Sequence, residues 1–123
     1  MTARDFRRIA LGMDGAVEAS HMNHPDFRVN GKIFATIHEG NAQGMVKLTP
    51  EQQERFIREY PAMFHLAPGA WGRQGSTMVA FDKASDEVVG EAMTLAWQNL
   101  ARAAKNESGI RRAKAARISR TRR

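Results

Sequence analysis

Apolar residues near the start of the chain recur at the spacing of an amphipathic helix. Thr2 and Asp5 stand three positions apart, as in a capping box, and mark the helix start. A first helix is therefore predicted over residues 3–12, with one buried face formed by Phe6, Ile9, Ala10 and Met13.

Two later stretches show the same helical periodicity. In the first, Thr49 is in the N-cap position and Gln52, three positions later, completes a capping box. Pro50 is in the first helical position, and Pro61 ends the helix. The second begins at Ser85 and loses its periodicity near Lys105. The residues predicted to be buried on these two helices are Phe56, Ile57, Tyr60, Val89, Ala92, Met93, Ala96, Trp97 and Leu100.

An extended pattern replaces the helical one between residues 24 and 37. Asn30-Gly31 separates two extended runs, and a two-residue hairpin turn at this point requires positive φ at both positions. With this turn as the loop, Phe27 faces Phe34 across the hairpin. The opposite face is predicted to hold Ile33, Ala35 and Ile37.

Shorter extended runs at residues 45–48 and 76–81 complete the predicted strands. The order of elements is then helix, three strands, helix, one or two strands, and helix. This order is typical of an α+β domain. We predict a two-layer sandwich in which helices pack on one face of a mostly antiparallel sheet.

The positive charge of the chain is concentrated at its C-terminal end. Residues 1–101 contain 10 Lys/Arg and 12 Asp/Glu, whereas residues 102–123 contain 9 Lys/Arg and a single acidic residue, Glu107. We therefore predict one domain over residues 1–104 and a basic, disordered tail over residues 105–123. Such a tail attracts polyanions, and its candidate phosphate contacts are Arg111, Arg112, Lys114 and Arg117.

Composition disfavours several classes of protein. There is no cysteine to form a disulfide or a thiolate metal site. The longest strictly apolar run, from Met78 to Phe81, is too short to span a membrane, and the N-terminus lacks the apolar core of a signal peptide. We therefore expect a cytoplasmic protein.

The residues also disfavour catalysis and metal binding. Ser76 and Thr77 do not lie in a nucleophile elbow. His21 and His24 are three positions apart, but Pro25 disfavours a helix at His24, so this spacing does not place both rings on one face. We expect a non-catalytic protein with no cofactor and no metal.

Four segments, HPDFRVNGKIFATI, VKLTPEQQ, PGAWGRQGST and AWQNLA, follow one another along the chain. In this order they resemble the MmcQ/YjbR family of small bacterial proteins, over a stretch from about Phe6 to Ala101. The resemblance implies a double-wing α+β fold with a topology similar to that of frataxin. It also implies DNA binding, an assignment that is itself inferred for the family.

The resemblance also marks individual positions. The family's motif residues correspond here to His24, Pro25, Phe27, Arg28, Gly31, Lys32, Phe34, Ala35, Lys47, Leu48, Gly69, Trp71, Gly72 and Gly75. Many members carry a second tryptophan after the last of these glycines, where this chain has Ser76. If that aromatic belongs to a binding face, this protein binds more weakly than those members.

Two interpretations of Trp71 follow from its surroundings. Flanking glycines let the backbone bend, so the indole closes one end of the core in the first interpretation. In the second, the indole is a stacking surface beside cations, as in proteins that bind nucleic acids. The cations expected near it are Arg28, Lys32, Lys47 and Arg73.

We therefore expect a nucleic-acid-binding protein, with DNA favoured over RNA and a monomer favoured over an oligomer. Arg28, Lys32, Lys47 and Arg73 would contact phosphates, Trp71 would stack on a base, and the tail would add sequence-independent affinity. The alternative is a protein-interaction or small-ligand domain, in which the motif residues serve the fold and only the tail contacts polyanions.

Overall fold

The computed structural model of the chain describes residues 1–102. The helices are α1 (Ala3–Leu11), α2 (Pro50–Glu59), α3 (Gly69–Arg73) and a C-terminal helix over residues 86–102. The strands are β1 (Val17–His21), β2 (His24–Val29), β3 (Lys32–Ile37), β4 (Gln43–Lys47), β5 (Phe64–Leu66) and β6 (Ser76–Ala80). Two short 3₁₀ turns are η1 (Glu39–Asn41) and η2 (Phe81–Lys83).

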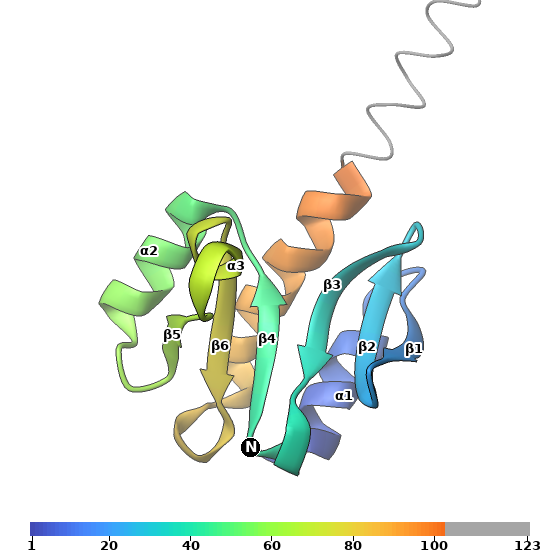
Figure 1. Cartoon of the computed structure of the whole chain (residues 1–123), viewed down its shortest axis with the longest axis horizontal. Helices are drawn as coiled ribbons and strands as arrows, with labels where there is room; N and C mark the ends of the chain where they lie inside the picture. Colours follow the sequence, from blue (N-terminus) through green and yellow to red (C-terminus); the bar gives the residue numbers. More distant parts are fainter. Residues whose placement is uncertain (103–123) are drawn as a thin grey trace, which may run out of the picture.

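The strands form one antiparallel sheet in the order β1-β2-β3-β4-β6-β5 (Figure 1). This arrangement confirms the predicted α+β class. The edge strand β1 is an addition to the prediction, and it is joined to β2 by a second tight turn in which Met22 and Asn23 both have positive φ.

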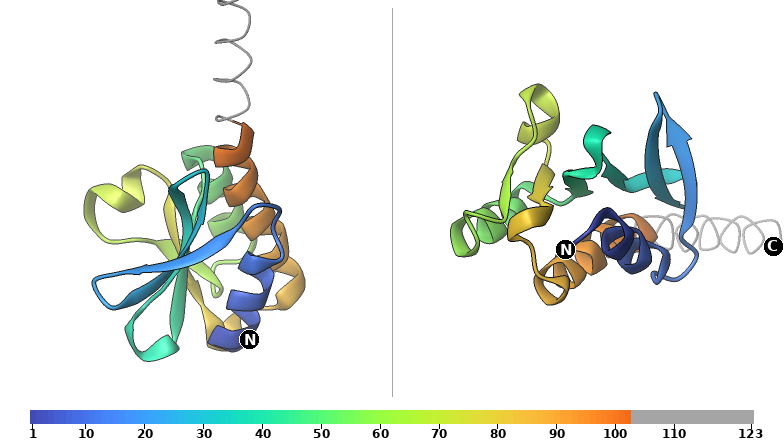
Figure 2. Two further views of the ribbon diagram at one scale, coloured as in Figure 1. Left: turned by 90° about the vertical axis from the view of Figure 1, so that its right-hand side faces the viewer. Right: turned by 90° about the horizontal axis from the view of Figure 1, so that it is seen from below.

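The helices lie mostly on one side of the sheet. α1 and the C-terminal helix cover one face, and α2 packs beside β5 on the same side (Figure 2). The predicted two-layer arrangement is therefore confirmed for these three helices. The short helix α3 differs, because it stands on the opposite side, across from the β1–β2 hairpin (Figure 2). The open face of the sheet lies between α3 and this hairpin.

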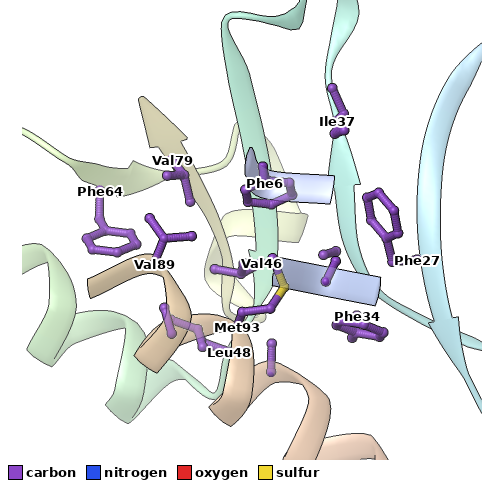
Figure 3. Close-up of a cluster of buried hydrophobic side chains, with 14 of the residues drawn as sticks. Phe6, Phe27, Phe34, Ile37, Val46, Leu48, Phe64, Val79, Val89 and Met93 are labelled. Atoms are coloured by element: carbon purple, nitrogen blue, oxygen red, sulfur yellow. The ribbon is translucent and has the colours of Figure 1, made fainter. Parts of the chain in front are cut away.

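The hydrophobic core fills the space between the sheet and its covering helices (Figure 3). Phe6 of α1 lies at its centre, with ring centroids 6.4 Å from Phe27 and 5.1 Å from Phe81. The C-terminal helix contributes Val89 and Met93, both fully buried. Each such side chain contributes about 1.5–3 kcal/mol on burial, so this layer holds the sheet and helices together.

Both predicted capping boxes form. The Thr2 hydroxyl accepts a hydrogen bond from the Asp5 backbone N–H at 3.2 Å, and the Asp5 carboxylate accepts one from the Thr2 N–H at 2.9 Å. Thr49 and Gln52 make the same reciprocal pair at the start of α2. Each cap satisfies backbone donors that would otherwise be unpaired, and contributes about 1 kcal/mol.

The hairpin between β2 and β3 forms around the predicted Asn30-Gly31 turn, with positive φ at both residues. Its register departs from the prediction further along. Phe27 pairs with Ala35, because a bulge inserts Phe34 as an extra residue on β3. The predicted pairing of Phe27 with Phe34 is therefore wrong, although both rings are fully buried.

The bulge also reverses the faces predicted for the end of β3. Ala35 and Ile37 belong to the core, rather than to the opposite face with Ile33. Thr36, between them, faces the open side of the sheet together with Ile33. An extra residue shifts a strand's alternation by one position, so a strict period of two could not predict these faces.

Candidate functional site

A groove of about 810 Å³ lies on the open face of the sheet. Its sides come from the β1–β2 hairpin and from α3, which rise on the same side of the sheet (Figure 2). It is lined by four of the predicted contacts, each from a different element: Arg28, Lys32, Lys47 and Trp71. Arg73 is exposed on α3 but does not line the groove.

Trp71 is 67% exposed on α3. The interpretation in which its indole closes one end of the core is therefore wrong. Pro68 is extended and Gly69 has φ +67°, so the chain turns outward just before the indole. Trp71 offers a large, rigid, half-apolar surface for contact with a ligand.

Two glycines of the Trp71 segment have a structural role. A Cβ on Gly72 would lie 2.0 Å from the carbonyl oxygen of Ala67. A Cβ on Gly75 would lie 1.9 Å from the carbonyl oxygen of Leu48, at a residue with φ +111°. Because the backbone passes this close to its neighbours, side chains are excluded at both positions. The motif thus combines glycines that serve the fold with an exposed tryptophan.

Gln53 of α2 holds the Trp71 segment in place through its side-chain amide. This buried residue of α2 donates hydrogen bonds from Nε2 to the carbonyl oxygens of Gly72 at 2.9 Å and Ser76 at 3.0 Å. The two bonds fix both ends of the turn that follows Trp71. Sequence reasoning missed this residue, because one polar residue on a helix gives no periodic signal of its own.

Lys32 and Lys47 are the cations of the groove that remain free for a ligand. Both side chains are exposed, and neither makes a salt bridge with any side chain that the structure describes. Lys32 follows the hairpin turn at the start of β3, and Lys47 ends β4. The two ammonium groups therefore belong to different strands of one groove.

Arg28, by contrast, is paired with a buried carboxylate. Its Nε and Nη2 donate hydrogen bonds to Asp26, at 2.7 and 3.0 Å. Asp26 has no exposed surface and also accepts a 2.7 Å hydrogen bond, which we assign to Nδ1–H of His21. The hydrogen bonds from Arg28, reinforced by His21, hold the pKa of the Asp26 carboxyl below its ordinary value.

Three histidine rings form a row at the β1–β2 end of the groove, and two of them, His21 and His38, line it. The ring centroids of His21 and His24 are 6.4 Å apart, and those of His24 and His38 are 5.7 Å apart. Burial lowers the pKa of His38, and the charges of His24 and His21 add to this effect. Among the described residues, no group of three or more His, Cys, Asp or Glu is placed to hold a metal.

Some predictions fall beyond this part of the chain. The boundary between domain and tail, and the tail residues Arg111, Arg112, Lys114 and Arg117, lie outside the described residues. Over residues 1–102, no helix has the length and apolar character needed to cross a membrane.

Comparisons with known proteins place the fold and the family. No curated protein matches the chain. The crystal structure of the Deinococcus radiodurans protein DR2400, described as a DUF419 domain, is similar to this structure with a TM-score of 0.66 and 19% sequence identity. The similarity covers 80% of this chain and 78% of that one. The model of the YjbR family matches residues 11–99, and on this match the chain belongs to the YjbR family.

Proposed function

We propose that this protein binds nucleic acid in the groove on the open face of its sheet, without catalysing a reaction. The observation that supports this proposal is the shared position of Lys32, Lys47 and Trp71. They come from distant parts of the chain and line one groove, with the indole 67% exposed. Cations beside an exposed aromatic ring are the combination that grips a sugar-phosphate strand.

The proposed contacts are of two kinds, ion pairs with phosphates and stacking on a base. Lys32 and Lys47 pair with phosphates and release counterions, so affinity falls as salt rises. Trp71 stacks on a base, an interaction that contributes about 1–3 kcal/mol. Arg28 contributes less than expected from its charge, because Asp26 already accepts two of its hydrogen bonds. DNA is the proposed ligand, as the resemblance implies.

The tail supplies a second, independent source of affinity in this proposal. Residues 102–123 carry 9 Lys/Arg against one acidic residue, whereas residues 1–101 are slightly acidic. The tail would therefore hold any polyanion near the protein, and the groove would add contacts that depend on its own side chains.

Fluorescence anisotropy with labelled DNA across a salt titration tests the proposal on the full-length chain. We expect Trp71→Ala to weaken binding at least fivefold, and Lys32→Gln with Lys47→Gln to reduce the salt slope by about two. The matched control is Lys83→Gln, an exposed lysine of η2 that does not line the groove. Wild-type affinity and slope in both groove variants would contradict the proposal.

The alternative function assigns all polyanion binding to the tail. It is tested by repeating the titration with a chain that ends at Lys105. If DNA binding disappears with the tail, and the groove variants of the full chain bind as the wild type does, the domain serves another ligand. If the shortened chain still binds with a salt dependence that Trp71→Ala alters, the groove is the site.

A further inference from the structure

The floor of the groove is a row of three side chains from neighbouring strands. Thr36 of β3 is the Cα partner of Met45 on β4, and Met45 is the partner of Met78 on β6. All three line the groove. Side chains at paired positions of adjacent strands are neighbours on one face, so a hydroxyl-bearing residue and two methionines form a continuous floor.

The Thr36 hydroxyl is the unexplained polar group of this floor. The residue is 5% exposed, and its Oγ1 has no hydrogen-bond partner among the residues that the structure describes. A buried hydroxyl without a partner destabilises a fold, and in native structures such a group commonly has a functional reason. Met45, the Cα partner of Thr36 on β4, has an unbranched and flexible side chain, so the floor beside the hydroxyl can adapt its shape to a ligand.

The space above this floor lies next to Trp71. Ser76, on β6, also lines the groove. Ser76 is two positions before Met78 on the same strand, so both small and flexible side chains face the groove that Trp71 also lines.

We propose that this floor is a subsite for one unpaired nucleobase, so that the groove binds single strands in preference to duplexes. This inference rests on the proposed nucleic-acid binding and specifies the form of the ligand. The base would lie against Met45 and Met78, with its polar edge toward the Thr36 hydroxyl. Its phosphates would face Lys32 and Lys47 at the groove's sides.

Size and chemistry both favour an unpaired base. A groove of about 810 Å³ falls in the size range of small-molecule sites, so it has room for a single base. In a duplex, each base has its faces stacked and its pairing edge occupied. Only an unpaired base can present a face to the methionines and a free edge to Thr36 at the same time.

The test uses the full-length chain, a short labelled single-stranded DNA and the same strand annealed to its complement. We expect tighter binding of the single strand, and its displacement by thymidine monophosphate. Ribose 5-phosphate, which has the phosphate but no base, should not displace it at the same concentration. Because every variant carries the same tail, the tail's contribution cancels in ratios between variants.

Thr36→Val removes the hydroxyl and keeps the shape of the side chain. We expect it to weaken single-strand binding about fivefold and leave duplex binding unchanged, while Thr36→Ser retains wild-type affinity. The melting temperature of Thr36→Val should not fall, because the hydroxyl that this variant removes has no hydrogen-bond partner in the described part of the chain. Thr94→Val is the matched control, since the Thr94 hydroxyl donates to the Gly90 carbonyl at 2.7 Å on the C-terminal helix.

Different failures overturn different claims. If duplex and single strand bind equally, and both respond to Trp71→Ala, nucleic-acid binding stands and the base subsite is wrong. Single-strand binding by Thr36→Val at wild-type affinity, or displacement by ribose 5-phosphate as efficient as by thymidine monophosphate, also overturns the subsite. Nucleic-acid binding that no groove variant changes overturns both proposals.

Discussion

Arg28 and Asp26 form a two-point ion pair on β2, with Nε 2.7 Å from Oδ1 and Nη2 3.0 Å from Oδ2. The same carboxylate also binds His21 of β1, so it ties the edge strand to its neighbour. The Arg28 guanidinium, which the sequence predicts to contact phosphate, therefore has a structural partner in Asp26. The charge left for a ligand resides mainly on Lys32 and Lys47.

This pairing predicts that Arg28 and Lys32 respond differently to substitution. We expect Arg28→Gln to lower the melting temperature by a few degrees and to change the salt slope of DNA binding by less than half a unit. Lys32→Gln should leave the melting temperature unchanged and reduce that slope by about one. Thermal unfolding and anisotropy titrations measure the two effects, and equal losses of slope would show that Arg28 contacts phosphate directly.

Asp26 should make the protein sensitive to acid. Its pKa in the folded protein is below the ordinary value of 3.8, so the folded state binds fewer protons than the unfolded state in that range. The stability that it contributes is fully present above that value and is lost as the pH falls through the lower, folded pKa. Urea unfolding between about pH 5 and pH 2 should give a flatter profile for Asp26→Asn than for the wild type. Asp14→Asn, at an exposed carboxylate, is the control expected to follow the wild type.

His38 should add a second pH dependence nearer neutrality. Burial, with the charges of His24 and His21, holds its folded pKa below the ordinary value of 6.5. The unfolded state therefore takes up a proton first, and stability is lost as the pH falls from that value through the folded pKa. Unfolding between about pH 7 and pH 5 should be less pH-dependent in His38→Gln than in His65→Gln, an exposed histidine outside this row. Equal slopes in the two variants would show that His38 titrates alike in both states.

The elements with strong local signals could be predicted from the sequence. Both capping boxes and the Asn30-Gly31 turn depend on residue types at fixed offsets, and all three form. The strand β1 had no such signal, because its residues are exposed or half-buried and show no apolar face. Its turn places Met22 at positive φ, a conformation that methionine rarely adopts.

The sequence does not predict how the candidate contacts are arranged. Lys32, Lys47 and Trp71, which are predicted nucleic-acid contacts, line one groove, whereas Arg73 does not. Asp26 and Arg28 are two positions apart on β2, so their spacing predicts a shared face, but it does not predict that the carboxylate is fully buried. The Thr36 hydroxyl, which has no partner among the described residues, faces the groove because of the bulge in β3. The alternating sequence pattern does not predict this bulge.

Trp71→Ala should separate binding from stability. Because the indole is 67% exposed, its removal should change the free energy of unfolding by no more than about 0.5 kcal/mol. Trp97→Ala is the informative comparison, since Trp97 packs against the core and donates a 2.8 Å hydrogen bond to the Asp14 carbonyl. Urea unfolding should show a loss of about 3 kcal/mol for that variant. A comparable loss in the free energy of unfolding of Trp71→Ala would show that Trp71 stabilises the fold.

Gly75→Ala should be among the most destabilising single changes in the domain. The added Cβ would meet the Leu48 carbonyl at 1.9 Å, and alanine is strained at φ +111°. We expect a loss of about 3 kcal/mol or more in the free energy of unfolding, because the backbone of two segments must separate.

Gly90→Ala is the matched control. Nothing lies within 4 Å of its new Cβ in the C-terminal helix, so it should gain about 0.5–1 kcal/mol. Chemical denaturation of both variants measures the contrast. A Gly75→Ala protein as stable as the wild type would mean that the Trp71 segment can move away from Leu48 at little cost.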